Sequence, residues 1–172
     1  MTAADVLLSR ALVEEATKKS GLIWVRGTGP SRALWHVWHE GAAVLVGDGP
    51  GEQPLPPGVD AGAVAEVTVR SKDKGGRLVV WSAAVEVLDP HSEAWEAAVG
   101  ELRGKRLNAP DADLMTERWA RECRIVRLTP GESRTDLPGT SQAAPPLPTG
   151  ATTRQTAPPA LPRLLLKRRG RR

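Results

Sequence analysis

Two neighbouring segments in which apolar residues recur at every second position constrain the fold of this chain most. In residues 63–70, Ala65, Val67 and Val69 alternate with polar residues. In residues 78–88 the apolar residues that share one face are Val79, Trp81, Ala83, Val85 and Val87. Successive side chains of a strand point to opposite faces, so this pattern predicts two antiparallel strands with one buried face. The polar, Gly-rich residues 71–76 between them are predicted to form a turn.

Shorter apolar runs predict four further strands, at residues 22–25, 33–38, 42–46 and 124–128. His39-Glu40-Gly41 has the length and the glycine of a hairpin loop. Residues 48–59 contain four prolines and three glycines and are predicted to form a long loop. This loop lacks the Lys and Ser/Thr of a P-loop and opens no helix, which excludes a nucleotide P-loop.

Three helical segments accompany the predicted strands. Asp5–Lys19 carries apolar residues at helical spacing, which form one stripe: Leu7, Leu8, Ala11, Leu12 and Ala16. Ser92 can cap a second helix that ends near Arg106, and a short helical turn is predicted at 114–121. Together the elements predict an α+β fold around an antiparallel β-barrel. Small open barrels often cover an edge or a face by dimerising, so a homodimer is expected.

The residues after Thr129 have a different composition. They hold eight of the fifteen prolines, with eight Lys/Arg and two Asp/Glu, so residues 1–129 carry a net charge of −2. We therefore predict a folded domain at 1–129 and a disordered tail at 130–172. A mildly acidic domain does not favour a basic nucleic-acid-binding face. For the basic end, Lys167–Arg172, three interpretations stay open: contact with nucleic acid, contact with an anionic membrane, or solubility alone.

Cys123 is the only cysteine, which excludes an intramolecular disulfide and a site of several thiolates. The N-terminus has no apolar run typical of a signal peptide, and no stretch approaches the roughly 20 apolar residues of a membrane span. We therefore expect a cytoplasmic protein. His36 and His39 lie three apart on a predicted strand, so they point to opposite faces and do not share a metal.

Two groups of side chains are candidates for a binding site. The basic residues Arg70, Lys72, Lys74 and Arg77 surround one predicted turn, and Arg32 precedes a neighbouring strand. Guanidinium and ammonium groups bind phosphate, so the turn is a candidate phosphate site; a solvated turn is the alternative. Among the tryptophans, Trp24, Trp35, Trp38 and Trp81 either fill the core or form a stacking wall for a flat ring.

The order of these elements resembles the pyridoxamine 5′-phosphate oxidase-like family, the FMN-binding split barrels. Residues 30–35, Pro-Ser-Arg-Ala-Leu-Trp, resemble the family's strand that carries a phosphate-binding Arg. Residues 77–88 match the length and pattern of its Arg-Gln-Val-Arg-x-x-Gly-x-Val-Glu strand, and a helix follows at residue 91. Three features depart from the true oxidases: Leu78 replaces a flavin-contacting Gln, residues 49–54 replace a Ser-Arg-Lys loop, and the C-terminal Ser-Arg-Pro is missing.

The resemblance implies a divergent split barrel, dimeric, that uses FMN or a deazaflavin as an oxidoreductase; some relatives bind haem or nothing known. It implies phosphate contacts from Arg32 and from the hairpin that contains Arg70, Ser71, Lys72, Lys74 and Arg77. His36, Trp38 and Trp81 would line the ring pocket. Two alternatives stay open. One is a non-enzymatic barrel without a cofactor, and the other is an interaction protein that uses its basic tail.

Overall fold

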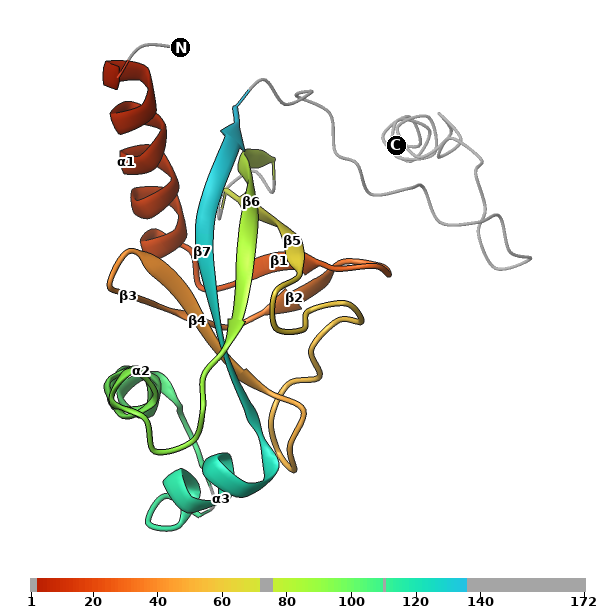
Figure 1. Cartoon of the computed structure of the whole chain (residues 1–172), viewed down its shortest axis with the longest axis vertical. Helices are drawn as coiled ribbons and strands as arrows, with labels where there is room; N and C mark the ends of the chain where they lie inside the picture. The colour runs from red at the N-terminus through yellow and green to blue at the C-terminus, as the bar shows by residue number, and fades with distance from the viewer. Residues whose placement is uncertain (1–2, 72–75, 110, 136–172) are drawn as a thin grey trace, which may run out of the picture. The chain divides into compact units, whose positions relative to one another are not determined.

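The computed structural model describes residues 3–71, 76–109 and 111–135 (Figure 1). Three helices and seven strands follow one another in these residues. The helices are α1 (Ala3–Lys19), α2 (Glu93–Lys105) and α3 (Met115–Glu122). The strands are β1 (Ile23–Arg26), β2 (Arg32–Leu34), β3 (Val37–His39), β4 (Ala42–Gly47), β5 (Val64–Arg70), β6 (Arg77–Val87) and β7 (Arg124–Arg134).

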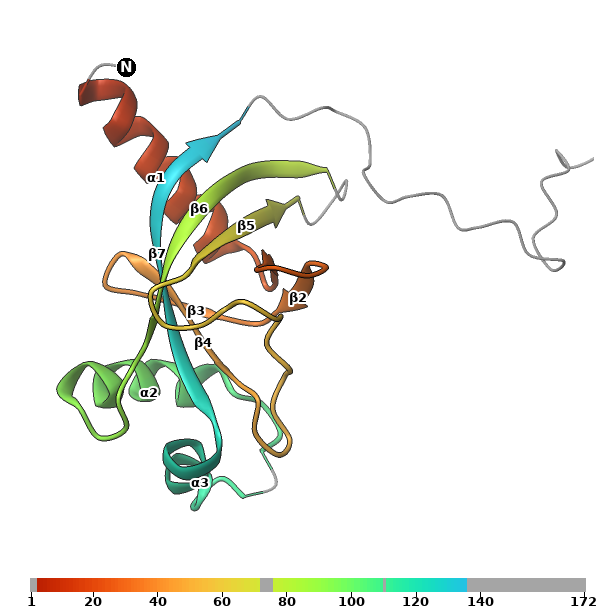
Figure 2. The same cartoon turned by 45° about the vertical axis from the view of Figure 1, so that its right-hand side comes forward.

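All seven strands belong to one antiparallel sheet with the order β2-β1-β5-β6-β7-β4-β3. The long strands β6 and β7 lie at its centre and curve strongly (Figures 1 and 2). The two edge strands, β2 and β3, follow each other directly in the chain, so the sheet curls until its edges come close. This arrangement confirms the predicted α+β split barrel, with seven strands instead of about six.

Two hydrophobic cores lie on opposite faces of the sheet. The inner core holds Trp81, Leu128 and side chains from nearly all the strands, so it fills the curl. The outer core packs Trp95 of α2 and Trp119 of α3 against β3, β4 and β7. Every residue of β4 is buried, because both of its faces are covered. Burying a large apolar side chain contributes about 1.5–3 kcal/mol, so these two cores are the main source of stability.

Helix α1 packs against the inner core through Val13, and not through the leucine stripe formed by Leu7, Leu8 and Leu12. Val13 is 2% exposed and Thr17 is fully buried, whereas Leu7 and Leu8 are 67% and 73% exposed. Leu12 of the same stripe is 41% exposed. The helix therefore covers the inner core with a narrow side, and the described residues leave Leu7, Leu8 and Leu12 exposed.

The predicted strand at 33–38 is divided in the structure. β2 pairs with β1 at one edge, and β3 pairs with β4 at the other. Between them, the Gln53 side chain bonds the backbone of Trp35: its Oε1 accepts from the amide at 2.8 Å and its Nε2 donates to the carbonyl at 2.9 Å. The side-chain amide replaces a neighbouring strand where the chain passes from one edge to the other.

The last strand is longer than predicted. It was expected to end at Leu128 but continues to Arg134, past the predicted domain boundary at residue 129. Pro130 is tolerated because it lies opposite Ala83 next to a register shift, where a missing backbone N–H is least costly. From residue 136 on, the predicted disordered tail lies outside the described residues. Within the described part, no helix is long and apolar enough to cross a membrane.

Candidate functional site

The open end of the β5–β6 hairpin brings two arginines together. Arg70 and Arg77 are partners across the two strands, beside a register shift. The Ser71 amide donates to the Gly76 carbonyl at 2.8 Å, which fixes the hairpin at this point. The Arg70 guanidinium also lies over the Trp24 ring, with Cζ 4.5 Å from the ring centroid, a cation–π contact.

Three guanidinium nitrogens of this pair have no acceptor within the described residues. They are Nε of Arg70 and Nε and Nη2 of Arg77, and all three are buried. A buried donor without a partner is costly, and the cost is larger for a charged group. Two adjacent cations with free N–H groups fit a phosphate, whose oxygens accept several bonds at once. The pair therefore meets the chemical requirement for holding the phosphate of a cofactor.

A cavity of about 330 Å³ lies between this hairpin and the C-terminal half of α1. Arg70, Ser71 and Leu78 line it from the sheet, and Lys19 is among its lining residues on the helix. The ammonium of Lys19 pairs with Glu15 at 2.9 Å on the exposed side of α1. Glu15 lines the cavity as well and balances Lys19, so the unbalanced positive charge at this cavity comes from Arg70.

The other predicted phosphate ligands are placed differently. Lys72 and Lys74 lie outside the described residues. Arg32 is opposite Val25 in β1, whereas Arg70 lies over Trp24, the residue before it. Consecutive strand residues point to opposite faces, so Arg32 and Arg70 lie on different sides of the sheet. Arg32 is exposed and donates to the Leu55 carbonyl at 3.3 Å, so the structure does not bring it to the arginine pair.

The three residues expected to line a ring pocket do not share one cavity. Trp81 is 1% exposed in the inner core, and Trp38 packs against that core. Trp81 also borders a groove of about 450 Å³ on the sheet, together with Val80 and Ser82. His36 is buried below α1, where its Nε2 lies 2.9 Å from the Thr17 carbonyl. Burial lowers the His36 pKa to about 4, so its ring is neutral at pH 7.

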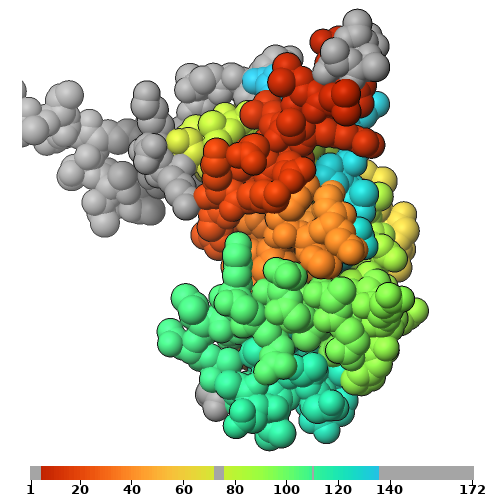
Figure 3. Space-filling view, turned by 90° about the vertical axis from the view of Figure 1, so that its left-hand side faces the viewer, coloured from red at the N-terminus to blue at the C-terminus, as the bar shows by residue number. Residues whose placement is uncertain are grey.

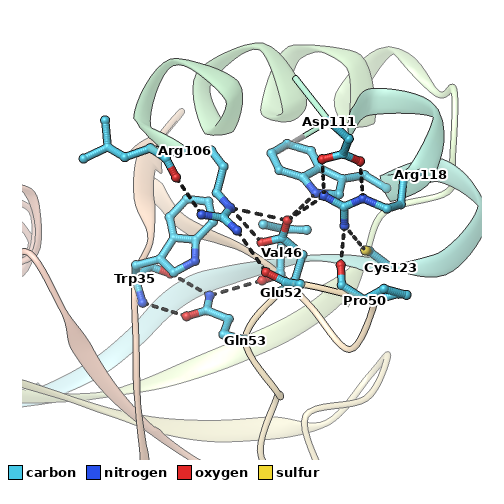
Figure 4. Close-up of polar contacts among 12 residues, drawn as sticks. Trp35, Val46, Pro50, Glu52, Gln53, Arg106, Asp111, Arg118 and Cys123 are labelled. Carbon is cyan, nitrogen blue, oxygen red and sulfur yellow. Dashed lines mark hydrogen bonds and ion pairs between the residues drawn. The ribbon is translucent and has the colours of Figure 1, made fainter. Parts of the chain in front are cut away.

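A buried polar network is the feature that the sequence did not indicate (Figure 4). Glu52 comes from the long loop, and its side chain is fully buried. Its carboxylate accepts from Arg106 Nε at 3.1 Å, from Arg118 Nη2 at 3.1 Å and from Trp119 Nε1 at 2.9 Å. Bonds to charged donors are stronger than neutral ones, so Glu52 fixes the loop against α2 and α3.

Asp111 completes the network. Arg118 donates to both of its carboxylate oxygens, with Nε 2.6 Å from Oδ2 and Nη2 3.2 Å from Oδ1. These hydrogen bonds lower the pKa of Asp111, and they raise the pKa of Arg118 above its usual range. Two carboxylates thus balance the guanidinium groups of Arg106 and Arg118. Because every one of these charges is matched and bonded inside the network, we interpret it as structural rather than reactive.

Cys123 lies at the edge of this network, half-buried, with its Sγ 3.9 Å from Arg118 Nη1. Burial raises the pKa of the thiol, because the thiolate loses its hydration. We expect iodoacetamide to alkylate the folded protein more slowly at pH 8 than the same chain in urea, with the rate profile shifted to higher pH. Mass spectrometry of timed samples measures this at a single thiol. Equal rates in the folded and unfolded chains would contradict it.

The described residues contain no group of three His, Cys, Asp or Glu side chains that could hold a metal ion. A metal centre is therefore not supported within residues 3–71, 76–109 and 111–135. The arginine pair is the best candidate site on chemical grounds, because a bound anion would accept hydrogen bonds from its three buried N–H groups, which have no acceptor among the described residues.

Comparisons with known proteins agree with the fold. No protein-family model and no curated protein matches the sequence. The solved structure of the heme storage protein HutZ from Vibrio cholerae is similar at 9% identity and a TM-score of 0.51, over 72% of this chain and 91% of that one. A Listeria innocua protein assigned as a pyridoxamine 5′-phosphate oxidase is similar at 10% identity and a TM-score of 0.50, over 73% and 95%. At such identities the likeness establishes the fold alone.

Proposed function

From the split-barrel fold that this chain shares with the pyridoxamine 5′-phosphate oxidase-like proteins, we propose that it binds a flavin-type cofactor and acts as an oxidoreductase. FMN, or a deazaflavin, would supply the electron transfer. The observation that carries the proposal is the set of three buried guanidinium nitrogens on Arg70 and Arg77 without an acceptor among the described residues. These two side chains hold the phosphate, and the hairpin bond at Ser71 orients them.

The ring of the cofactor has room along the same strand. Trp81 follows Arg77 by four residues, which is roughly 13 Å at the usual rise of a strand. The groove of about 450 Å³ that Trp81 borders is also lined by Val80 and Ser82 of β6. We therefore place the phosphate of the cofactor at the arginine pair and its ring in the groove farther along β6. The roles expected for Lys72 and Lys74 stay predictions.

A comparison of FMN with riboflavin tests the proposal, since the two differ only in the phosphate. The purified full chain is titrated with each compound, and the quenching of flavin fluorescence is recorded. We expect FMN to bind at least about 100-fold more tightly than riboflavin, because two charge-assisted contacts go to its phosphate. Equal affinities would contradict phosphate binding, and an absence of binding to both would contradict a flavin cofactor.

A second candidate is a non-enzymatic barrel that keeps the fold without a cofactor. This candidate is favoured because Trp81 is buried in the inner core and Trp38 packs against it, so these rings contact the protein itself and not a ligand. Mass spectrometry of the small molecules that co-purify with the native protein decides between the two. A flavin or deazaflavin in the sample excludes this candidate.

We also propose that the protein is a homodimer, since Leu7, Leu8 and Leu12 of α1 are exposed and no described residue covers them. Light scattering during gel filtration is expected to give twice the chain mass of 18.4 kDa. Leu8→Glu puts a charge into the stripe and is expected to shift the protein to a monomer. The control is Arg103→Glu, at an exposed position of α2. A monomeric wild-type protein would contradict the proposal.

A further inference from the structure

A second cavity lies where three distant segments of the chain meet. Its volume is about 300 Å³, and it is lined by Ser20, Gly21, Trp35, His36, Lys105, Arg106 and Leu107. Figure 3 shows the side of the molecule where these segments lie, with α1 in red above, the β3–β4 segment in orange, and α2 in green below. The cavity shares only Ser20 with the cavity beside the arginine pair, so the two cavities are separate sites.

His36 lines this cavity and has one ring nitrogen that can accept a hydrogen bond. The ring is 3% exposed, and its bond to the Thr17 carbonyl requires Nε2 to carry the proton. In a neutral ring the other nitrogen, Nδ1, is then an acceptor. Nδ1 is buried and has no partner among the described residues. The free lone pair therefore suits a ligand that offers an O–H or N–H group.

The end of α2 gives the cavity positive charge. Lys105 is exposed at the last position of the helix. Each guanidinium nitrogen of Arg106 already donates to the protein: Nε to Glu52, Nη1 to the Leu107 carbonyl at 2.8 Å and Nη2 to the Gly51 carbonyl at 2.9 Å. Since Glu52 also balances the charge of Arg106, the exposed Lys105 is the group that we expect to contact an anion.

We propose that this cavity binds a small carboxylate with a neighbouring hydroxyl group, a 2-hydroxy acid, whose hydroxyl donates to His36 Nδ1 and whose carboxylate contacts Lys105. The half-buried Trp35 ring forms an apolar wall for the carbon skeleton. A volume of this size is at the lower end of ligand sites and suits a small molecule. The neutral ring excludes a carboxylate alone as an equal ligand, because Nδ1 then has no proton to donate.

Nuclear magnetic resonance of the histidine rings tests this site directly. The chain has three histidines, so His39→Gln and His91→Gln identify the His36 signals without changing His36. The 15N-labelled full chain is titrated at pH 7 with glycolate, and separately with acetate, which lacks the hydroxyl. We expect glycolate to shift the His36 Nδ1 resonance to lower frequency, as a nitrogen that accepts a hydrogen bond does, and acetate to leave it in place.

Two exposed substitutions on α2 provide the matched control. Lys105→Gln is expected to weaken glycolate binding by about tenfold, since a charge-assisted bond is lost. Arg103→Gln, which does not line the cavity, is expected to leave the affinity unchanged. The proposal is overturned if glycolate does not move the His36 signal, if acetate moves it equally, or if the two variants bind glycolate alike. A site filled by ordered water alone gives the first of these results.

Discussion

Glu52→Gln is expected to lower the free energy of unfolding by about 3–5 kcal/mol, the loss that follows when one member of a buried ion pair is removed. The carboxylate is fully buried and accepts from two guanidinium groups and one indole. Glutamine has nearly the same shape, so the loss does not come from a cavity. Its NH2 group would face donors of Arg106 and Arg118, and it removes the negative charge that both arginines share.

Urea denaturation at pH 7, followed by tryptophan fluorescence, measures this loss. The midpoint is expected to fall while the slope stays constant, because the same surface is exposed on unfolding. Glu86→Gln, at an exposed position of β6, serves as the control and should change stability by less than about 0.5 kcal/mol. A loss below about 1 kcal/mol for Glu52→Gln would show that the network does not stabilise the loop.

A double-mutant cycle locates the interaction. If Glu52 acts through Arg106, then Arg106→Gln costs stability in the wild-type protein and much less in the Glu52→Gln variant. Additive losses would mean that the two side chains stabilise the protein independently, despite the 3.1 Å contact between them.

The sheet could be predicted because its signal is local. In residues 63–70 and 78–88 every second side chain faces the core and is apolar, so the strand pattern is visible within a few neighbouring residues. The signal for the start of α2 is also local, because the Ser92 side chain accepts a hydrogen bond from the amide of Trp95, three residues later. Contacts between residues close in sequence leave a pattern that one sequence can show.

Features that depend on distant residues could not be predicted. The break between β2 and β3 comes from Gln53, 18 residues after Trp35, and nothing near Trp35 indicates it. Glu52 lies 66 residues before Arg118, in a Gly- and Pro-rich loop that is typical of an exposed segment. The leucine stripe of α1 likewise gives no sign of which side meets the barrel, because that is decided by the shape of the core.

Of the candidate site, the sequence predicts the part that depends on neighbouring residues and not the part that depends on distant ones. Arg70 and Arg77 flank one turn, so their proximity follows from the hairpin itself. Arg32 was included because it precedes a neighbouring predicted strand and because the resemblance assigns it to phosphate, but the pairing of β2 with β1 puts it on the other face of the sheet. His36 and Trp81 lie on different segments, and only the folded barrel shows that they border separate cavities.

The double variant Arg70→Gln/Arg77→Gln is expected to weaken FMN binding by about 10²–10⁴-fold. Each arginine offers hydrogen bonds to a charged group, which contribute about 1.5–3 kcal/mol apiece, and each 1.4 kcal/mol is a factor of ten. Riboflavin has no phosphate, so its affinity should stay the same. Fluorescence titration of both compounds measures the two effects, and Arg103→Gln on α2 controls for the loss of a positive charge elsewhere.

Stability of the ligand-free protein provides an independent measurement of the same pair. Its free donors and like charges oppose folding when no anion is bound, so the double variant should melt no lower than wild type. Inorganic phosphate should raise the melting temperature of wild type and not of the variant, because a ligand stabilises only a state that binds it. A variant that melts several degrees lower without ligand would contradict the assignment, since the arginines would then have protein partners.

Arg32→Gln tests whether the phosphate contact predicted from the sequence for Arg32 exists beside the arginine pair found in the structure. If phosphate is held only by the arginine pair, FMN affinity should change less than about threefold, because Arg32 lies on the opposite face and donates to the Leu55 carbonyl. A loss similar to that of Arg77→Gln would place the phosphate beside β2 instead. The arginine pair would then have to bind a different anion, because its three buried donors still lack an acceptor among the residues described.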